Sequence, residues 1–159
     1  MVRVVSTLLF LLCTLGAQAQ FQSVVVYGSE LSWQCLGQGK YQFTAVVYTG
    51  CQNDLTFQSH NLVGPALGTF YPMHIDTANT GNVNNCGTCD QKRWIIKTDT
   101  ISLTGTPPST GWTFVYQRCC RANTQNFASA SVIGPIHLST TLYPYTPPGS
   151  ANPLPLDSC

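Results

Sequence analysis

The feature that most constrains the fold is an alternation of apolar and polar residues on both sides of a glycine-rich turn. Residues 30–35 (ELSWQC) alternate, Gly37-Gln38-Gly39-Lys40 follows, and residues 41–48 (YQFTAVVY) alternate again. Successive side chains of a β-strand point to opposite faces, and a short glycine turn joins antiparallel neighbours. The sequence therefore predicts an antiparallel hairpin in which Leu31, Trp33 and Cys35 share one face.

Further strands are expected along the rest of the chain, and no window has apolar residues at helical spacing. The expected strands are residues 24–27, 93–103, 112–118, 130–133 and 136–143, with weaker signals at 55–57 and 70–75. The Gly-, Asn- and Thr-rich chain between residues 49 and 85 is expected to form loops or edge strands. Many short strands separated by turns favour an all-β fold, an immunoglobulin-like β-sandwich with disulfides, and an open β-barrel is the alternative.

The N-terminal segment has the form of a secretory signal peptide. Arg3 precedes the apolar run 8–12, and Ala17-Gln18-Ala19 fits the site that signal peptidase cleaves. Cleavage of residues 1–19 after Ala19 leaves residues 20–143 for one β-sandwich domain and residues 144–159 for a Pro-rich extended tail or linker. No apolar run reaches the roughly 20 residues that a membrane helix needs. We expect a secreted or cell-surface protein that is not membrane-embedded.

The composition and the scattered polar residues argue against several functional classes. Charged residues make up 8% of the chain and the formal net charge is +1, so no basic patch for nucleic acid is expected. The carboxylates show no acid/base pattern, there is no GxSxG elbow, and the histidines are isolated. We predict no enzyme activity, no cofactor and no metal site, and an extracellular protein or glycan as the unknown partner.

A small secreted carbohydrate-binding domain or glycan-acting enzyme is the alternative. Tyr48, Tyr71 and Tyr143 could then form a sugar-binding platform, although core packing is the favoured role for most of them.

The cysteines indicate disulfides, because the chain is expected to be exported. Of eight cysteines, Cys13 lies in the leader, which leaves seven. If the hairpin turn centres on Gln38 and Gly39, Cys35 lies opposite Gln42 and about 30 Å from Cys51, so these two cysteines should not bond each other. The connectivity is otherwise open. The candidates for internal bridges are Cys35, Cys51, Cys86, Cys89, Cys119 and Cys120, and Cys159 is expected to be unpaired or intermolecular.

Two kinds of short motif, a CxxC pair and an Asp-Thr-apolar sequence, suggest specific roles for their residues. Cys86-Gly87-Thr88-Cys89 precedes a strand and not a helix N-terminus, so a structural disulfide is favoured over a redox pair or zinc ligands. Thr77 in Asp76-Thr77-Ala78 and Thr100 in Asp99-Thr100-Ile101 fit the Asp-Ser/Thr-apolar pattern of bacterial O-glycosylation. They are candidate acceptors.

Two segments resemble the N-terminal module of large secreted Bacteroidota surface proteins, which carry PKD or other immunoglobulin-like repeats and a gliding-motility-associated sorting domain. Residues 30–41 (ELSWQCLGQGKY) and 48–51 (YTGC) are similar to the family's E-x-x-Y-x-C-L-G-x-x-x-Y and Y-R-D-C motifs. Residues 111–121 (GWTFVYQRCCR) resemble its Y-Q-R-C-C-R-N signature, with Ala122 in place of the asparagine. The likeness spans about residues 27–126.

This resemblance implies a noncatalytic extracellular or cell-surface module for adhesion or surface assembly. It also implies the N-terminal domain of a longer protein, so that the chain is expected to be truncated at Cys159.

Overall fold

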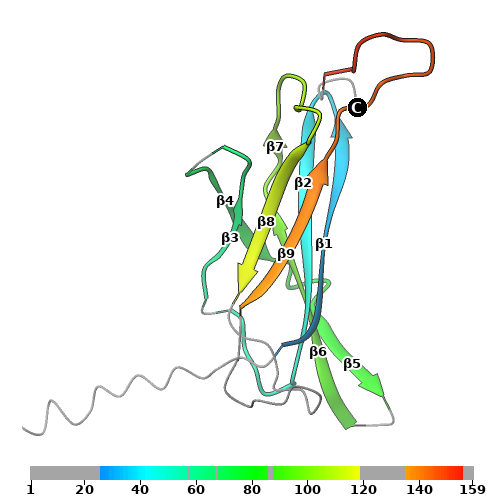
Figure 1. The fold of residues 1–159 in the computed structure, drawn as a ribbon. Helices are drawn as coiled ribbons and strands as arrows, with labels where there is room; N and C mark the ends of the chain where they lie inside the picture. The colour runs from blue at the N-terminus through cyan, green and yellow to red at the C-terminus, as the bar shows by residue number, and fades with distance from the viewer. Residues whose placement is uncertain (1–25, 57, 67, 86–87, 119–134, 156–159) are drawn as a thin grey trace, which may run out of the picture.

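The computed structural model describes residues 26–56, 58–66, 68–85, 88–118 and 135–155, and the side chains of residues 84–90 are outside this description. All regular structure in these ranges is β-strand, which confirms the predicted all-β class (Figure 1). None of the described segments forms a helix with the length and apolar character needed to cross a bilayer. The strands are β1 (Val26–Gly37), β2 (Lys40–Thr49), β3 (His60–Val63), β4 (Phe70–Ile75), β5 (Gly81–Asn85), β6 (Thr88–Thr98), β7 (Ile101–Ser102), β8 (Trp112–Arg118) and β9 (Ile136–Leu142).

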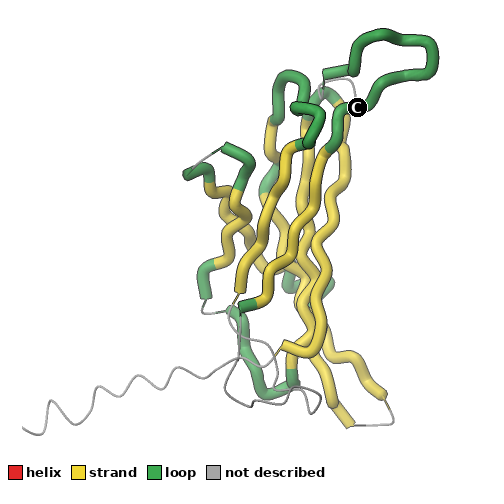
Figure 2. The backbone as a smooth tube through the Cα atoms, viewed as in Figure 1, coloured by secondary structure: helices red, strands yellow, loops and turns green. Residues whose placement is uncertain are grey.

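Seven of the strands follow one another around a single, nearly closed sheet. Hydrogen-bonded neighbours run in the order β1-β2-β6-β4-β3-β8-β9, while β5 pairs with β6 and β7 pairs with the start of β2. β6 pairs with both β2 and β4, which joins strands that a sandwich would place in two sheets. The architecture therefore corresponds to the open β-barrel alternative. Figure 2 shows strands along the length of the barrel and loops mostly near its ends.

The ring has one seam, between β1 and β9. These strands lie against each other, but no ladder joins them among the described residues. Each of the six neighbouring pairs from β1 to β9 is antiparallel, so β1 and β9 run parallel. Both therefore finish at the same end of the barrel, which we call the hairpin end because it carries the β1–β2 turn (Figure 1). Val26 and Ile136 begin these strands toward the opposite end.

The β1–β2 hairpin forms as predicted, with a local shift in register. Gln38 and Gly39 form its turn, with φ of 53° and 70°, as a type I′ turn requires. Cys35 pairs with Tyr41 and not with Gln42, because the register shifts between Cys35 and Gly37. Leu36 has no partner in the ladder and is 48% exposed.

The predicted strand over residues 93–103 is divided in two. β6 ends at Thr98, where it pairs with Met73 of β4, and β7 begins at Ile101. The Thr98 hydroxyl accepts a hydrogen bond from the Phe43 backbone N–H at 3.0 Å, which satisfies β2 where β6 turns away. A side chain thus replaces one rung of the ladder.

The segment between residues 49 and 85 contains more strand than its composition indicates. β4 coincides with the weak signal at 70–75, and β3 and β5 are additional strands in a region expected to hold loops or edges. Leu55 and Thr56, in contrast, are not in a strand, so the weak signal at 55–57 was wrong for these two residues. Residues 57 and 130–133 lie outside the described ranges.

Side chains fill the interior of the barrel. Phe43 of β2 and Phe114 of β8 meet across it with ring centroids 4.4 Å apart, and Tyr71 lies 6.3 Å from Phe114. Leu31 and Cys35 also pack against this core from β1. The buried core comprises Val26, Tyr41, Phe43, Ala45, Val47, Leu55, Leu62, Met73, Trp94, Ile96, Ile101, Leu103, Phe114, Tyr116, Ile136 and Leu142.

Candidate functional site

Cys35 and Cys51 are each disulfide-bonded in the structure, but not to each other. Cys35 pairs across the hairpin with Tyr41, whereas Cys51 follows Thr49 at the far end of β2. Eight residues of strand separate Tyr41 from Thr49, about 26 Å, and a disulfide needs Cα atoms within about 7 Å. Each therefore bonds a cysteine whose side chain is not described. The side chains of Cys86, Cys89, Cys119, Cys120 and Cys159 all lie outside the description.

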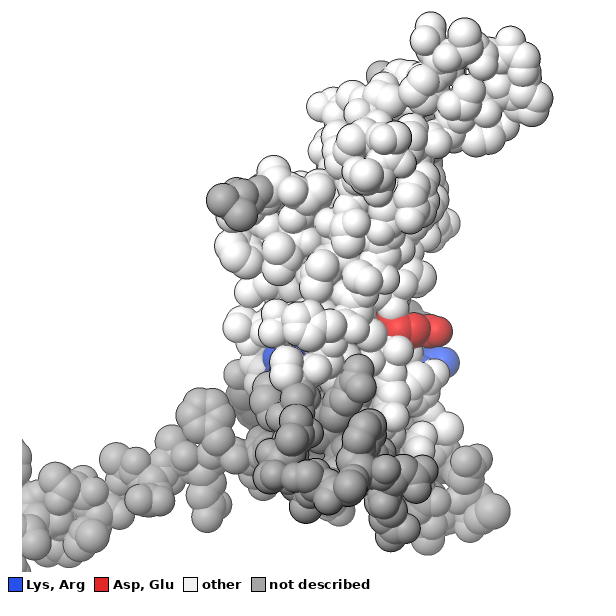
Figure 3. All heavy atoms as spheres, in the orientation of Figure 1, with Lys and Arg blue, Asp and Glu red and all other residues white. Residues whose placement is uncertain are grey.

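Five of the seven large apolar side chains that are exposed among the described residues belong to the β1–β2 hairpin or to the tail after β9, and we call these five the hairpin-end surface. Their exposed fractions range from 38% for Leu154 to 65% for Tyr143. The members are Trp33 and Leu36 from β1, and Tyr143, Tyr145 and Leu154 from the tail that follows β9. Because β1 and β9 run parallel, the hairpin turn and this tail occupy one end of the barrel (Figure 1). On the face shown in Figure 3, no Lys, Arg, Asp or Glu colour is visible at this end, and the exposed Lys40 beside the turn is the charged residue of the hairpin there.

Backbone contacts hold the tail part of this surface in place. Leu154 N–H donates to the Tyr145 carbonyl at 2.8 Å, so the tail folds back on itself. Gly111 has a φ of 77°, and a Cβ there would collide with Thr141 and lie 3.2 Å from a ring carbon of Tyr143. The chain thus needs glycine at this position to pack β8 against the start of the tail. A surface fixed in this way loses little entropy when it binds.

The hairpin part is supported by an aromatic contact. The Trp33 and Tyr41 rings meet edge to face with centroids 5.8 Å apart, while Trp33 remains 42% exposed. Of the tyrosines considered for a sugar-binding platform, Tyr143 is exposed and Tyr48 and Tyr71 are half-buried. The sequence gives little sign of this surface, since its members come from two distant segments and Leu36 becomes exposed only through the irregular register.

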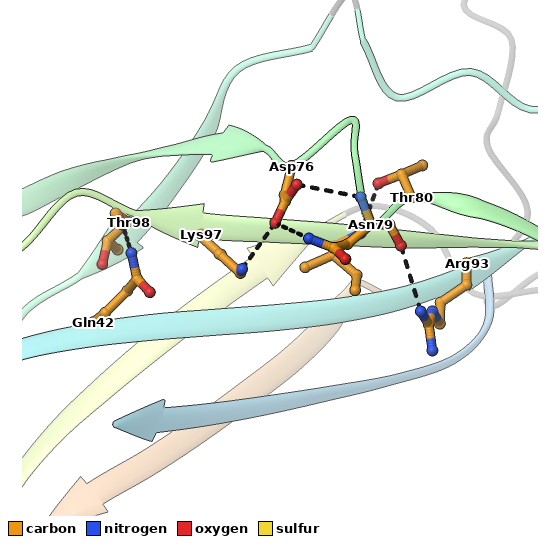
Figure 4. A network of polar contacts seen from close by, with 8 residues as sticks. Gln42, Asp76, Asn79, Thr80, Arg93, Lys97 and Thr98 are labelled. Atoms are coloured by element: carbon orange, nitrogen blue, oxygen red, sulfur yellow. Dashed lines mark hydrogen bonds and ion pairs between the residues drawn. The ribbon is translucent and has the colours of Figure 1, made fainter. Parts of the chain in front are cut away.

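Asp76, which follows β4, organises a polar network on the outside of the sheet (Figure 4). Its Oδ2 accepts hydrogen bonds from Lys97 Nζ and Asn79 Nδ2, both at 2.8 Å. These bonds lower the pKa of Asp76 to about 2, so the carboxylate is ionised at neutral pH and is no general acid. Thr80 Oγ1 accepts from the Ile95 N–H at 3.1 Å and ties the same turn to β6. The network secures the β4–β5 turn.

The two candidate O-glycosylation acceptors are both exposed. Thr77 lies in the turn after Asp76, and Thr100 lies between β6 and β7. Asp99, next to Thr100, lies with its Oδ2 3.6 Å from the Nε2 of His74, and both side chains are exposed. Exposure permits modification at both threonines, and both assignments stay predictions.

A buried polar pair connects β3 with β8 near the opposite end. His60 Nδ1 lies 2.9 Å from the Tyr116 hydroxyl, and His60 Nε2 lies 3.2 Å from the Leu55 carbonyl oxygen. A carbonyl only accepts, so Nε2 carries the proton and Nδ1 accepts from Tyr116. Burial lowers the pKa of His60 and raises the pKa of Tyr116 to about 12, which keeps both neutral at pH 7. Within the described ranges, no three metal-ligating side chains cluster.

Comparison with known proteins adds no relative. No protein-family model, no curated protein and no solved structure matches the chain. The likeness to the Bacteroidota surface module therefore stays a prediction from the hairpin and double-cysteine motifs.

Proposed function

We propose that the chain is a noncatalytic extracellular or cell-surface β module that serves adhesion or surface assembly by contacting a protein through the hairpin-end surface. The gathering of five exposed apolar side chains at one end of the barrel carries this proposal. Protein interfaces are enriched in Trp and Tyr and depleted of charge at their centres, and exposed apolar patches on a folded domain mark interaction sites.

The aliphatic members favour a protein partner over a sugar. Sugars stack on the flat faces of aromatic rings and need polar groups that fix their hydroxyls. Leu36 and Leu154 offer neither, whereas both can pack against apolar side chains of a protein partner. A carbohydrate-binding domain or glycan-acting enzyme is the alternative that the experiment below must separate.

The exported location rests on the sequence. The leader is expected to be removed after Ala19, and the resemblance implies the N-terminal domain of a longer surface protein. N-terminal sequencing of the protein from the medium or surface of the producing cells should give Gln20 as the first residue. An N-terminus at Met1 on protein retained in the cytosol would contradict export.

The binding test uses fluorescently labelled protein on producing cells from which the native protein has been deleted. We expect saturable binding that protease treatment of the cells abolishes. Trp33→Ser and Tyr145→Ser should each weaken binding by at least about tenfold, the loss typical of a residue central to an interface. Tyr27→Ser is the matched control, because Tyr27 is 55% exposed and lies at the opposite end.

Three outcomes would contradict the proposal. The first is absent or unsaturable binding, and the second is a control variant that loses as much affinity as the two test variants. The third is loss of binding after mild periodate oxidation of surface sugars when protease leaves binding intact, which would favour the glycan alternative. A glycan array and a glycoside turnover assay on the same protein would then separate sugar binding from hydrolysis.

A further inference from the structure

We infer that strands β3 and β4, which we call the flap, are hinged on β6 and latched to β8 by His60, and that the flap opens when His60 takes up a proton. Two short ladders attach the flap to the rest of the barrel. β3 pairs with β8 over two residue pairs, and β4 pairs with β6 over three. The β1–β2 and β8–β9 ladders have ten and seven pairs. Weakly paired elements of a fold open at a lower free-energy cost than the whole domain.

The flap covers part of the apolar interior, while its turn end is free. Phe70, the first residue of β4, is 62% exposed, and Figure 1 shows this end of the flap standing apart from β8. Leu62 and Met73 are buried beneath the flap, and the Tyr71 ring lies 6.3 Å from that of Phe114. Opening of the flap therefore brings apolar side chains of the core into contact with water.

Side chains form the latch where the β3–β8 ladder stops. The pair of Leu62 with Tyr116 is the last of that ladder toward the start of β3. Beyond it, His60 Nδ1 accepts a hydrogen bond from the Tyr116 hydroxyl at 2.9 Å, and the two rings are stacked with centroids 6.2 Å apart. Arg118 Nη1 donates to the Ser59 carbonyl at 3.3 Å. The start of β3 is thus held to β8 by side chains, and His60 is central among them.

A proton on His60 breaks this arrangement. Nδ1 then donates and no longer accepts, and among the described residues the Tyr116 hydroxyl has no other acceptor. The proton also adds a positive charge beside Arg118, whose Nε is buried without an acceptor. Burial is the main cause that lowers the pKa of His60; the charge of Arg118 acts in the same direction, and the Leu55 carbonyl opposes both. The closed flap therefore excludes a proton that the open flap accepts.

The hinge side stays fastened under the same conditions. The Asp76 N–H donates to the Ile95 carbonyl at 2.8 Å, and the Asp76 carboxylate binds Lys97 Nζ at 2.8 Å. Because the pKa of Asp76 is about 2, these contacts do not change between pH 8 and pH 5. Acidification in this range releases β3 from β8 and leaves β4 joined to β6.

Other titratable groups near the flap do not act on the latch. Asp54 is exposed, and its carboxylate accepts two hydrogen bonds within its own loop. His74, on β4, is exposed and lies 3.6 Å from Asp99, so a proton there would strengthen attraction on the hinge side. His137 of β9 is exposed. Of the described titratable groups, Tyr116 and Arg118 are thus the ones that act on the buried ring of His60.

Amide hydrogen exchange measured by NMR on the purified protein tests the inference. Each exchange rate at pH 7.5 and at pH 5.0 is divided by the intrinsic rate of that residue at the same pH, under conditions in which closing is faster than exchange. If His60 has its usual pKa of 6.5 in the open flap and stays neutral in the closed one, the open population rises about 30-fold over this range.

The expected loss of protection is confined to the latch. The amides that bond β3 to β8, in the pairs Leu62–Tyr116 and Val63–Val115, should lose protection by at least about threefold and at most about 30-fold. The amides of Ala45 in the β1–β2–β6 part of the sheet should keep theirs, because that strand is paired on both sides.

Two variants separate His60 from other effects of pH. His60→Gln keeps an acceptor for the Tyr116 hydroxyl and a donor for the Leu55 carbonyl but takes up no proton, so its latch amides should be equally protected at both pH values. His74→Gln is the matched control, because it removes an exposed histidine from the same flap. It should show the same loss of protection as wild type.

Several results would overturn the inference. These are equal protection of the wild-type latch amides at the two pH values, an equal loss at Ala45, which would mean that the whole barrel opens, an undiminished loss in His60→Gln, and no loss in His74→Gln. NMR titration of the His60 ring in wild type decides the matter if His60→Gln does not fold, since a midpoint at or above pH 6.5 would exclude opening driven by this proton. All these measurements use the protein alone, so they are independent of the binding test above.

Discussion

Replacing Thr49 with valine removes the acceptor of a buried indole hydrogen bond while keeping the shape of the side chain. Trp94 Nε1 donates to Thr49 Oγ1 at 2.9 Å, and the two residues are 1% and 0% exposed. A buried donor that loses its partner costs about 1–3 kcal/mol. The Thr49 hydroxyl also contacts the half-buried Gly50 carbonyl at 3.1 Å, and water can replace that bond. We therefore expect Thr49→Val to lower the free energy of unfolding by about 2 kcal/mol.

Urea unfolding followed by far-ultraviolet circular dichroism measures this loss. With a slope of about 2 kcal/mol per molar urea, the midpoint should fall by about 1 M while the slope stays constant. Thr113→Val is the matched control, because the Thr113 hydroxyl contacts only the exposed Thr141 hydroxyl at 3.0 Å among the described side chains. Its free energy of unfolding should change by no more than about 0.5 kcal/mol.

A double-mutant cycle decides whether the hydrogen bond is the cause. In a Trp94→Phe background there is no indole N–H, so Thr49→Val should cost at least about 1 kcal/mol less than in wild type. Equal costs in the two backgrounds would refute the reasoning. So would a Thr49→Val midpoint equal to that of Thr113→Val.

Three further changes probe the core, the buried histidine and the turn. Phe114→Ala should lower the free energy of unfolding by about 3–5 kcal/mol in urea, because it opens a cavity against Phe43, and a loss below about 1 kcal/mol would contradict a filled barrel. Burial lowers the pKa of His60 from its usual value of 6.5. The stability that neutral His60 gives the fold is therefore fully present above pH 6.5 and is lost as the pH falls, because the unfolded chain then binds a proton that the fold excludes. Urea midpoints between pH 8 and 5 should fall less steeply for His60→Gln than for wild type, and parallel curves would refute this. Gln38→Gly should raise the free energy of unfolding by about 0.5 kcal/mol, because Gln38 has a φ of 53°, and a lower thermal midpoint would contradict the turn assignment.

The hairpin was the part of the fold most open to prediction, because its information is local. Alternation sets the faces of both strands, and Gln38-Gly39 sets the turn. The one-residue error at Cys35 arises at Leu36, where the register shifts, and nothing in the alternation marks that shift. A regular alternation predicts a regular ladder of strand pairs and does not predict β-bulges.

The alternation of apolar and polar residues could not predict that the sheet closes, because closure depends on pairing between strands that are far apart in the sequence. Inward residues of a sandwich and of a barrel have the same alternation. The difference lies in β6, which pairs first with β2 and then with β4, and in Thr98, whose hydroxyl covers the point of divergence. β5 was missed for another reason, since its residues Gly81–Asn85 (GNVNN) have little β-propensity and the strand depends on backbone pairing with β6.

Only separate parts of the candidate site could be predicted from the sequence. The sequence marks Cys35 as a bridging cysteine and Tyr143 as a possible exposed aromatic. It does not bring them together, because more than one hundred residues separate them. They lie at one end of the barrel because six antiparallel pairings in a row make β1 and β9 parallel. A single sequence does not reveal these pairings.

The parallel seam also sets how the domain responds to mechanical load. The chain enters β1 at one end of the barrel and leaves β9 at the other, so tension between Val26 and Leu142 acts along the strands. The β1–β2 ladder of ten residue pairs and the β8–β9 ladder of seven are then pulled lengthwise, and many hydrogen bonds share the force at once. An antiparallel seam would place both ends together and let the same ladders peel apart one bond at a time.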